Sequence, residues 1–358
     1  MKVDWTKDGL ANFHQPCWSL LVWSTRSTSG EKKIPLSEIE MKMVKDAIKT
    51  AEIHDSADDV NRQASRVANM IKTSKYCVAF TGAGISTAAG IGDFRGIHGK
   101  WTDRDKVKEH GEKAKKVIGK AKSRNFQILR PTYTHEALQK LLELGLIKYI
   151  ISQNVDGLHL LSGVQQDKIS ELHGNSFVEK CEKCDVRYPR SSRVGGKATN
   201  VPAKRCKDCR INHRTGRMCD IKKCGGYLMN TIINFGDSLE SDVLDRAEEN
   251  ASKADIFLCL GSTMQVSPAN DLVTMGKEPT RLVICNRQVT PYDETCFDTY
   301  QDGQQVGSRV FGDCDKFMKS LMKLLLSQEE LKKWEAGREA RLLQYDLQRK
   351  LTTEESKK

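Results

Sequence analysis

The chain has 358 residues, of which 38% are hydrophobic and 29% are charged, and its formal net charge is +11. This composition is typical of a soluble globular protein with one large domain plus extensions or an insert. The chain has no stretch of the roughly 18–20 apolar residues that span a membrane and no apolar secretory signal, so we expect no membrane partner. Without such a signal, the twelve cysteines favour a reducing compartment and metal binding over disulfides.

Two segments carry the positive charge. Residues 103–130 hold ten Lys and Arg against four Asp and Glu, and residues 179–227 hold fourteen against five. The remainder of the chain is net negative. Charge gathered in this way is typical of a protein that meets an anionic partner, so these basic segments predict contact with chromatin or nucleic acid. The alternative is a solvated surface with extra lysines.

The predicted elements begin with an N-terminal extension, residues 1–60. It is partly helical, because a charged helical pattern runs from Leu36 to about Thr73. Farther on, Pro131 and Thr132 open a helix for which Thr132 is the expected cap. Four short apolar runs predict strands, and each ends in glycine or polar residues: Cys77–Phe80, Ile147–Ile151, Ile256–Leu260 and Leu282–Cys285.

Strands that alternate with helices predict an α/β fold with a doubly wound, Rossmann-like parallel sheet. We expect residues 61–156 and 228–325 to build this sheet, and residues 157–227 to form a small domain with an inserted zinc-binding module. Residues 326–358 are expected to be a charged helical tail, either solvated or a partner-binding helix. Ligands bind beyond the carboxyl ends of the strands of such a sheet, so the polar strand ends predict one active site.

Three of the polar clusters suggest a nucleotide. TGAGIS, residues 81–86, is either an ordinary glycine turn or one that holds a pyrophosphate. GDFRG, residues 92–96, either orients a cofactor or forms a structural salt bridge with a packed Phe. QNVDG, residues 153–157, offers amide and carboxylate groups to a carboxamide such as that of nicotinamide. The imidazole of His173 can accept a hydroxyl proton near neutral pH, although a lone histidine is more often structural.

The cysteine-rich block predicts a metal site. Its apolar content is low, so it needs a staple in place of a hydrophobic core. Cys181 and Cys184 have the spacing of a zinc-binding pair, and a second pair would complete a tetrahedral structural site with no open position. The second pair is either Cys206 and Cys209, which have the better spacing, or Cys219 and Cys224, which lie closer to the returning sheet.

Eight motifs occur along the chain in an order found in one family. TGAGIST, GDFRG, SQNVDGLH, ELHGN, C-x2-C, NFGDSL, LGSTMQV and the strand end at Asn286 resemble the sirtuins, the NAD-dependent protein deacylases. The resemblance covers about residues 70–325. ISELHGNSFVEKCEKC and HRTGRMC are most similar to the nuclear branch, sirtuins six and seven. The resemblance implies NAD as cofactor, one structural zinc ion, acylated protein or histone tails as substrates, and the nucleus as location.

The resemblance also implies roles for individual residues. It makes His173 the general base, with Asn154 and Asp156 near the ribose and nicotinamide. An extended peptide is expected to pair, as an added strand, with residues that include Phe235, Gly236, Asp237, Gln265 and Val266. The nuclear branch favours Cys181, Cys184, Cys219 and Cys224 as zinc ligands. The cofactor-binding residues are expected to be Gly82, Ala83, Gly84, Ser86, Thr87, Asp93, Phe94, Arg95, Trp101, Gln153, Gly261, Ser262, Thr263, Asn286, Gln288 and Cys314.

The function expected from the resemblance is NAD-dependent removal of acyl groups from lysine side chains of histones or other chromatin proteins. The acyl group passes to the ribose while His173 takes a proton, and the products are nicotinamide, O-acyl-ADP-ribose and free lysine. The first alternative is a protein mono-ADP-ribosyltransferase that uses the same pocket. The second is a non-catalytic, zinc-stapled chromatin adaptor, which would have no need of Arg95, Asn154, Asp156 and His173 together.

Overall fold

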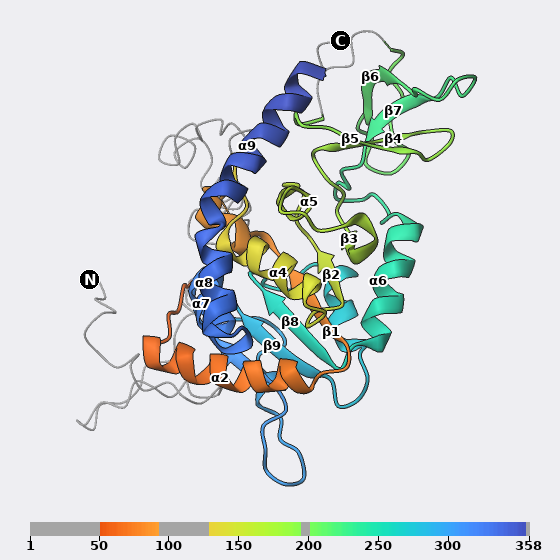
Figure 1. Cartoon of the computed structure of the whole chain (residues 1–358). Coiled ribbons are helices and arrows are strands. Elements are labelled where there is room, and N and C mark those ends of the chain that lie inside the picture. Colours follow the sequence, from red (N-terminus) through yellow and green to blue (C-terminus); the bar gives the residue numbers. More distant parts are fainter. Residues whose placement is uncertain (1–50, 93–128, 195–200, 356–358) are drawn as a thin grey trace, which may run out of the picture.

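The structure is a computed structural model that describes residues 51–92, 129–194 and 201–355, with side chains described up to Arg349. Most of the predicted N-terminal extension and of the first basic segment therefore lies outside the described residues. In the described part, a parallel sheet is flanked by helices and a smaller sheet lies beyond one end (Figure 1).

The central sheet has six strands in the order β10-β9-β8-β1-β2-β3, and every neighbouring pair is parallel. Its strands are β1 (Cys77–Thr81), β2 (Tyr149–Ser152), β3 (Ile169–Glu171), β8 (Ile256–Leu260), β9 (Arg281–Cys285) and β10 (Ser308–Val310). The four predicted strands are confirmed as β1, β2, β8 and β9. The sequence missed β3 and β10, because three residues are too few to show a pattern.

The strand order confirms the predicted doubly wound fold and determines where a ligand would bind. The chain moves outward from β1 to β3, passes through the small sheet, and continues from β8 to β10 on the other side of β1. Strands β1 and β8 pair along their full length, from Cys77 opposite Ile256 to Thr81 opposite Leu260. The order reverses between these two strands, and ligands of doubly wound sheets bind beyond the carboxyl ends at such a point.

Helices cover both faces of the sheet, which is why every residue of its central strands β1 and β8 is buried. Ala79 and Leu258 pack on one face against α2, α4 and α7, while Phe80 and Phe257 pack on the other against α6 and η5. Each fully buried phenylalanine contributes about 1.5–3 kcal/mol through the hydrophobic effect. The helices are α2 (Ala57–Thr73), η2 (Ala83–Ala89), α4 (Tyr133–Glu143), α5 (Leu158–Leu161), η4 (Gln166–Lys168), α6 (Ser241–Lys253), η5 (Ala269–Thr274), η6 (Glu294–Phe297), α7 (Cys314–Leu325), α8 (Gln328–Ala336) and α9 (Arg338–Glu355).

Polar caps define the starts of two helices. Thr132 precedes α4 as predicted, and its N–H donates to Nδ1 of His135 at 3.3 Å. Ser56 precedes α2, and its hydroxyl accepts a hydrogen bond from the N–H of Asp59 at 3.1 Å. Such caps satisfy backbone donors that a helix start leaves without partners. Among the described helices, none has the length and apolarity that a membrane crossing requires.

The small antiparallel sheet has the strand order β5-β4-β7-β6. Its strands are β4 (Val178–Cys181), β5 (Arg187–Pro189), β6 (Arg214–Met218) and β7 (Tyr227–Asn230). This module is inserted between the two halves of the central sheet, but its limits differ from the predicted small domain at residues 157–227. Strand β3 lies inside that range and yet belongs to the central sheet, and β7 extends the module to Asn230.

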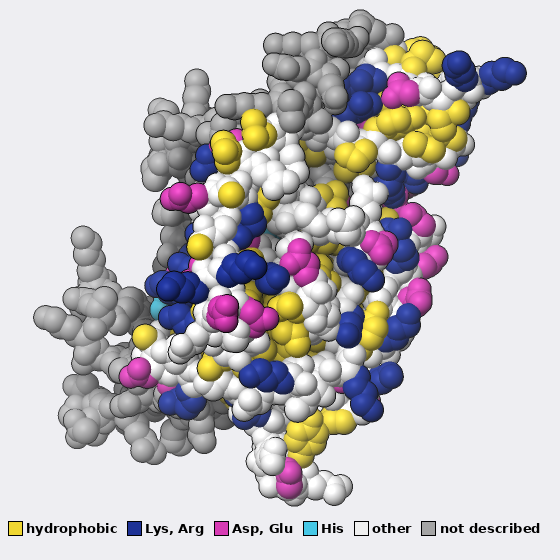
Figure 2. Space-filling view, in the orientation of Figure 1, with side chains coloured by type: hydrophobic (Ala, Val, Ile, Leu, Met, Phe, Trp, Pro, Cys, Tyr) yellow, Lys and Arg dark blue, Asp and Glu magenta, His cyan; other side chains and the backbone are white. Residues whose placement is uncertain are grey.

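Many basic side chains of the module are held in ion pairs. The buried carboxylate of Glu179 pairs with Arg190 and Arg217, and Glu182 pairs with Arg214. Figure 2 shows Lys and Arg side chains interspersed with Asp and Glu over one face of the molecule. The paired glutamates are already included in the count, so the excess of Lys and Arg in residues 179–227 remains after this pairing.

Two helices, α8 and α9, extend from the end of α7 alongside the helices that pack on the central sheet (Figure 1). Trp334 packs edge-on against Tyr133 of α4, with ring centroids 5.3 Å apart. The buried carboxylate of Glu136 pairs with Arg338 and Arg341. The tail is helical as predicted, but these contacts show that the expectation of a solvated tail is wrong. The sequence shows no sign of them, because apolar and charged side chains alternate along the tail without forming a clear apolar stripe.

Candidate active site

A cavity of about 790 Å³ lies beyond the carboxyl ends of the strands, at the reversal between β1 and β8. Its volume is in the usual range of small-molecule sites. Residues that follow each of the six strands of the central sheet line it. Of the predicted site residues, the structure brings together around this cavity Ala83, Gly84, Thr87, Gln153, Asn154, His173, Phe235, Gly236, Asp237, Gly261, Ser262, Thr263, Val266, Asn286, Gln288 and Cys314.

Some predicted residues lie elsewhere. The cavity wall does not include Gly82, Ser86, Asp156 or Gln265. The predictions for Asp93, Phe94, Arg95 and Trp101 fall outside the described residues. The sequence also missed part of the lining, namely Val155, Ile232, Ile233, Asn234, Leu244, Pro268, Arg287, Gly312 and Asp313. Most of these are chain neighbours of predicted residues, whereas Leu244 lies on α6, where no motif marks it.

Two glycines from distant parts of the chain meet backbone to backbone at the cavity wall. The N–H of Gly84 donates to the carbonyl oxygen of Gly261 at 2.8 Å. A Cβ at Gly84 would lie 2.6 Å from the Cα of Gly261, and Gly261 has a φ of +64°. No larger residue fits at either position, because the contact would force the loops after β1 and β8 apart. The predicted tight glycine turn is present, although a short 3₁₀ helix, η2, follows it.

The carboxylate of Asp156 lies behind the cavity wall and supports it through hydrogen bonds. Its Oδ2 accepts a hydrogen bond from the hydroxyl of Ser86 at 2.6 Å, and its Oδ1 accepts one from the N–H of Leu158 at 2.9 Å. The side-chain amide of Asn154, which lines the cavity, donates to the oxygen of Ser86 at 3.3 Å. Asp156 and Ser86 therefore position Asn154 from outside the cavity.

His173 presents one ring nitrogen as a base. Its Nδ1 lies 3.0 Å from the carbonyl oxygen of Gln153. A carbonyl oxygen only accepts, so Nδ1 carries the proton and Nε2 keeps its lone pair. Burial lowers the pKa of His173, and the hydrogen bond to Gln153 opposes this only in part. The imidazole is therefore neutral near pH 7 and able to accept a proton at Nε2.

The backbone at Gly174 fixes the position of His173. Gly174 has a φ of +78°, and a Cβ there would lie 1.8 Å from the carbonyl oxygen of Thr231. The chain from β3 therefore passes directly against the strand that returns from the small module. Only glycine permits this approach, which accounts for the glycine in ELHGN.

Two amide groups at the cavity have donors without protein partners. Ser262 donates to Oε1 of Gln153 at 2.8 Å, and Asn286 donates to Oε1 of Gln288 at 3.4 Å. These bonds turn each Nε2 away from its neighbour, and both Nε2 atoms are buried without a hydrogen-bond partner among the described residues. A buried donor without a partner is costly, so a ligand with hydrogen-bond acceptors fits here.

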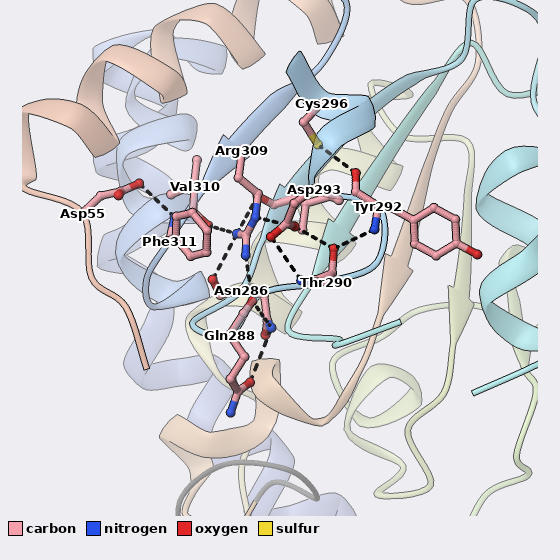
Figure 3. A network of polar contacts seen from close by, with 11 residues as sticks. Asp55, Asn286, Gln288, Thr290, Tyr292, Asp293, Cys296, Arg309, Val310 and Phe311 are labelled. Carbon is pink, nitrogen blue, oxygen red and sulfur yellow. Dashed lines mark hydrogen bonds and ion pairs between the residues drawn. The ribbon is translucent and has the colours of Figure 1, made fainter. Parts of the chain in front are cut away.

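A buried arginine holds the loop that carries Asn286 and Gln288 (Figure 3). Arg309 is 4% exposed, and its guanidinium donates to the carbonyl oxygens of Asn286 at 3.1 Å and Gln288 at 2.7 Å. The same guanidinium pairs with Asp293 at 2.7 Å and stacks over the ring of Phe311 at 3.7 Å. Arg309 is thus a positioning residue that the sequence analysis missed, since no motif singles out one arginine in a short strand.

Four cysteine sulfurs gather in the small module. The Sγ atoms of Cys181 and Cys224 are 3.6 Å apart, as are those of Cys184 and Cys219. These separations are too long for a disulfide, whose sulfurs are about 2.05 Å apart. Zinc–sulfur bonds of about 2.3 Å place tetrahedral thiolates about 3.8 Å apart, so this donor set fits zinc. Of the two alternatives, the structure therefore brings Cys219 and Cys224, not Cys206 and Cys209, to the first pair.

The comparisons with known proteins agree with this architecture. The sequence profile described as "Sir2 family" matches residues 82–268, which is more than half of the chain. The NAD-dependent protein deacetylase SRT1 of Arabidopsis thaliana is 39% identical over 68% of this chain and 47% of its own length. The NAD-dependent protein deacetylase Sirt6 of Drosophila melanogaster is 37% identical over 68% of this chain and 72% of its own length. The chain belongs to the Sir2 family.

Solved structures give the same result. A Sir2 homologue with a serine-to-alanine substitution, solved as a complex with ADP-ribose, is 27% identical and superposes with a TM-score of 0.53. The alignment covers 75% of this chain and 97% of that one.

Human NAD-dependent protein deacetylase sirtuin-7 is 35% identical over 76% of this chain and 62% of its own length. The chain spans about half the length of the Arabidopsis relative, so activity does not follow from these matches alone.

Proposed function

We propose that this protein is an NAD-dependent protein-lysine deacetylase that acts on histones or other chromatin proteins. The observation that carries the proposal is one cavity in which a neutral histidine base, two unpartnered amide donors and a glycine-lined backbone converge. An adaptor without catalysis would have no use for this combination. Relatives named as NAD-dependent protein deacetylases support the same reaction.

The cavity suits a dinucleotide. The Nε2 donors of Gln153 and Gln288 match the hydroxyl, carboxamide and ring acceptors that NAD offers. Gly84 and Gly261 let the loops after β1 and β8 meet at the cavity wall, where a pyrophosphate could approach the backbone of these glycine turns. When bound, NAD supplies the ADP-ribosyl group that accepts the acyl group, and nicotinamide is its leaving group.

The remaining roles belong to side chains of the chain itself. Nε2 of His173 takes the proton from a ribose hydroxyl, since its pKa leaves it neutral at pH 7. Asn154 orients the same end of the ligand from its hydrogen bond to Ser86. We propose Phe235–Ser238 and Val266–Ser267 as the walls between which an extended acyl-lysine peptide pairs as an added strand, because both segments line the cavity.

The zinc and chromatin parts of the proposal rest on composition and donor geometry. We assign one structural zinc ion to Cys181, Cys184, Cys219 and Cys224, whose sulfurs have the separations that zinc needs. The excess of Lys and Arg in residues 103–130 and 179–227 supports binding to nucleosomal DNA and residence in the nucleus. Such binding should weaken steeply as salt is raised, and binding that ignores salt would argue for a solvated surface.

The test is mass spectrometry of acetylated and myristoylated histone H3 peptides incubated with the full chain, with and without NAD and nucleosomal DNA. NAD-dependent loss of the acyl group with release of O-acyl-ADP-ribose is the expected result. Consumption of NAD with a gain of mass on protein instead would support mono-ADP-ribosyl transfer. If NAD is untouched under every condition, the adaptor alternative holds.

Two variants sharpen the test. Replacing His173 with alanine should lower turnover by at least about 100-fold, because a positioned general base contributes about 10²–10⁴-fold. His54→Ala is the matched control, since His54 is exposed and is not among the residues that line the cavity. Equal turnover in the His173 variant and the control would refute the proposed base.

A further inference from the structure

We infer that the small module binds a second metal ion, held by Cys206, Cys209, His213 and Asp237. These residues are separate from the four cysteines assigned above. Three of them lie in the segment between β5 and β7, and Asp237 lies in the loop that lines the cavity. The inference concerns metal content, so it does not depend on which reaction the cavity performs.

The four donor atoms have the separations of a coordination sphere. Sγ of Cys206 lies 3.3 Å from Oδ1 of Asp237, and Sγ of Cys209 lies 3.2 Å from Nε2 of His213. Nε2 of His213 lies 3.6 Å from Oδ2 of Asp237, and all four donor atoms lie within 4.8 Å of one another. Metal–ligand bonds of about 2.0–2.3 Å place the donors of a tetrahedral zinc ion about 3.3–3.8 Å apart. Three separations, two of them measured to different oxygens of Asp237, are close to the edges of such a tetrahedron, and the remaining ones lie within 4.8 Å.

The histidine is oriented by a neighbour in the way that metal sites require. Nδ1 of His213 lies 3.2 Å from Oδ1 of Asn230, and Nδ2 of Asn230 donates to the carbonyl oxygen of His213 at 3.1 Å. The second bond fixes which amide atom is the oxygen, so Nδ1 must be the protonated ring nitrogen. Nε2 then carries a lone pair toward the cluster. A ligating histidine usually has such an outer partner on its other nitrogen.

A tight hairpin presents the two thiols. The N–H of Cys206 donates to the carbonyl oxygen of Ile211 at 2.9 Å, and Arg205 and Asn212 form an isolated bridge across it. The N–H of Cys209 donates to Oδ1 of Asp237 at 3.2 Å. Few apolar side chains of residues 201–213 are buried, so polar contacts with Asp237 are important in holding the hairpin to the loop. A bound metal ion would hold the hairpin and the Asp237 loop together more firmly.

Two thiolates, one imidazole and one carboxylate suit zinc better than a hard cation. Calcium and magnesium prefer oxygen ligands, and an iron–sulfur cluster held by only two thiolates takes two histidines as well, whereas this group has one histidine. The same ion would fix Asp237 and, with it, the neighbouring Phe235 and Gly236 at the cavity. The second site would thus tie the inserted module to the wall that faces a peptide.

The experiment counts zinc in the full-length protein. The chain is equilibrated with Zn²⁺, freed of loose metal by gel filtration with a weak chelator, and its zinc content is measured by plasma mass spectrometry. We expect two zinc ions per wild-type chain and one in each of Cys206→Ser and His213→Gln. The matched control Asp208→Asn, which changes an exposed residue in the same turn, should retain two.

Cobalt replaces zinc in a second measurement, so that a variant that fails to fold leaves the inference testable. Wild-type protein loaded with Co²⁺ should have sulfur-to-cobalt charge-transfer absorption for six thiolates, and Cys206→Ser should lose a part of it. One zinc ion in the wild type, with charge transfer for four thiolates, would overturn the second site. So would an unchanged zinc content in both Cys206→Ser and His213→Gln.

Discussion

The hydroxyl of Ser86 donates to Oδ2 of Asp156 across 2.6 Å and joins the loops that follow β1 and β2. Both residues are buried, and neither belongs to the cavity wall. The carboxylate accepts a second hydrogen bond from the N–H of Leu158. The side-chain amide of Asn154 donates a hydrogen bond to the same hydroxyl oxygen, so the Ser86–Asp156 pair fixes the position of a side chain in the site.

Removal of that hydroxyl should therefore destabilise the fold. We expect Ser86→Ala to lower the free energy of unfolding by about 1–3 kcal/mol, because a buried carboxylate loses a donor. The measurement is urea unfolding of the purified chain. Ser65→Ala is the control, since Ser65 is exposed on α2 and its loss should change stability by no more than about 0.5 kcal/mol. Equal stability of the two variants would contradict the positioning role.

The sequence predicted the sheet and most of the site because both depend on local patterns. Buried parallel strands appear as short apolar runs, and the polar residues at their ends belong to the site by topology alone. Asp156 was predicted to surround the ligand, but it lies behind Asn154. Spacing identifies residues near a site, whereas only packing decides which side chain faces the cavity and which supports it.

Other features lie beyond local pattern. Arg309 acts through carbonyl groups of another strand's loop, and a contact across 21 residues leaves no periodic trace. The second cysteine pair was ambiguous, because Cys206 and Cys209 have ligand spacing of their own. His213 follows Cys209 by four positions, but Asp237 lies 28 residues beyond Cys209 and only the fold brings it to this group.

Gly174 allows a test of close backbone approach. Gly174→Ala should destabilise the protein by well over 2 kcal/mol, because its Cβ would overlap the carbonyl oxygen of Thr231 as well as straining a φ of +78°. Gly303→Ala is a matched control with a φ of +79° and no atom within 4 Å of the added Cβ. That variant should lose only about 1–2 kcal/mol. Thermal or urea unfolding of the two variants measures the difference in stability. Equal losses would mean that small backbone movements remove the overlap at Gly174 with little loss of free energy.

The ion pairs between α9 and α4 allow a test of whether α9 stabilises the core. Arg341→Gln should cost about 2 kcal/mol, because the Glu136 carboxylate is 2% exposed and, among the described residues, would keep only Arg338 as a charged partner. The exposed pair of Arg62 and Asp59 provides the control, and Arg62→Gln should cost less than about 0.5 kcal/mol. Unfolding midpoints in urea compare the two. A loss in Arg341→Gln as small as in the control would mean that α9 does not stabilise the core.

Two buried histidines make the fold sensitive to acid. Burial lowers the pKa of His135 to about 3 and that of His159 to about 3, and the His135 ring, whose centroid lies 4.8 Å away, contributes to the lower pKa of His159. In the unfolded chain a histidine has a pKa of about 6.5. Between these values the unfolded state binds more protons than the native state, so stability rises with pH and is lost as pH falls below about 6.5.

Replacing one of these histidines should flatten that dependence. Between pH 6.5 and 5.5 the unfolded-state proton uptake of one histidine costs about 1 kcal/mol of stability. We therefore expect His159→Asn, whatever its stability at pH 7.5, to lose about 1 kcal/mol less than the wild type over this interval. Zinc ligands also release metal in acid, but that contribution is common to both proteins and cancels in the difference. His54→Asn changes an exposed histidine and should retain the wild-type slope. Identical slopes in wild type and His159→Asn would show that His159 is protonated in the native state as readily as in the unfolded chain.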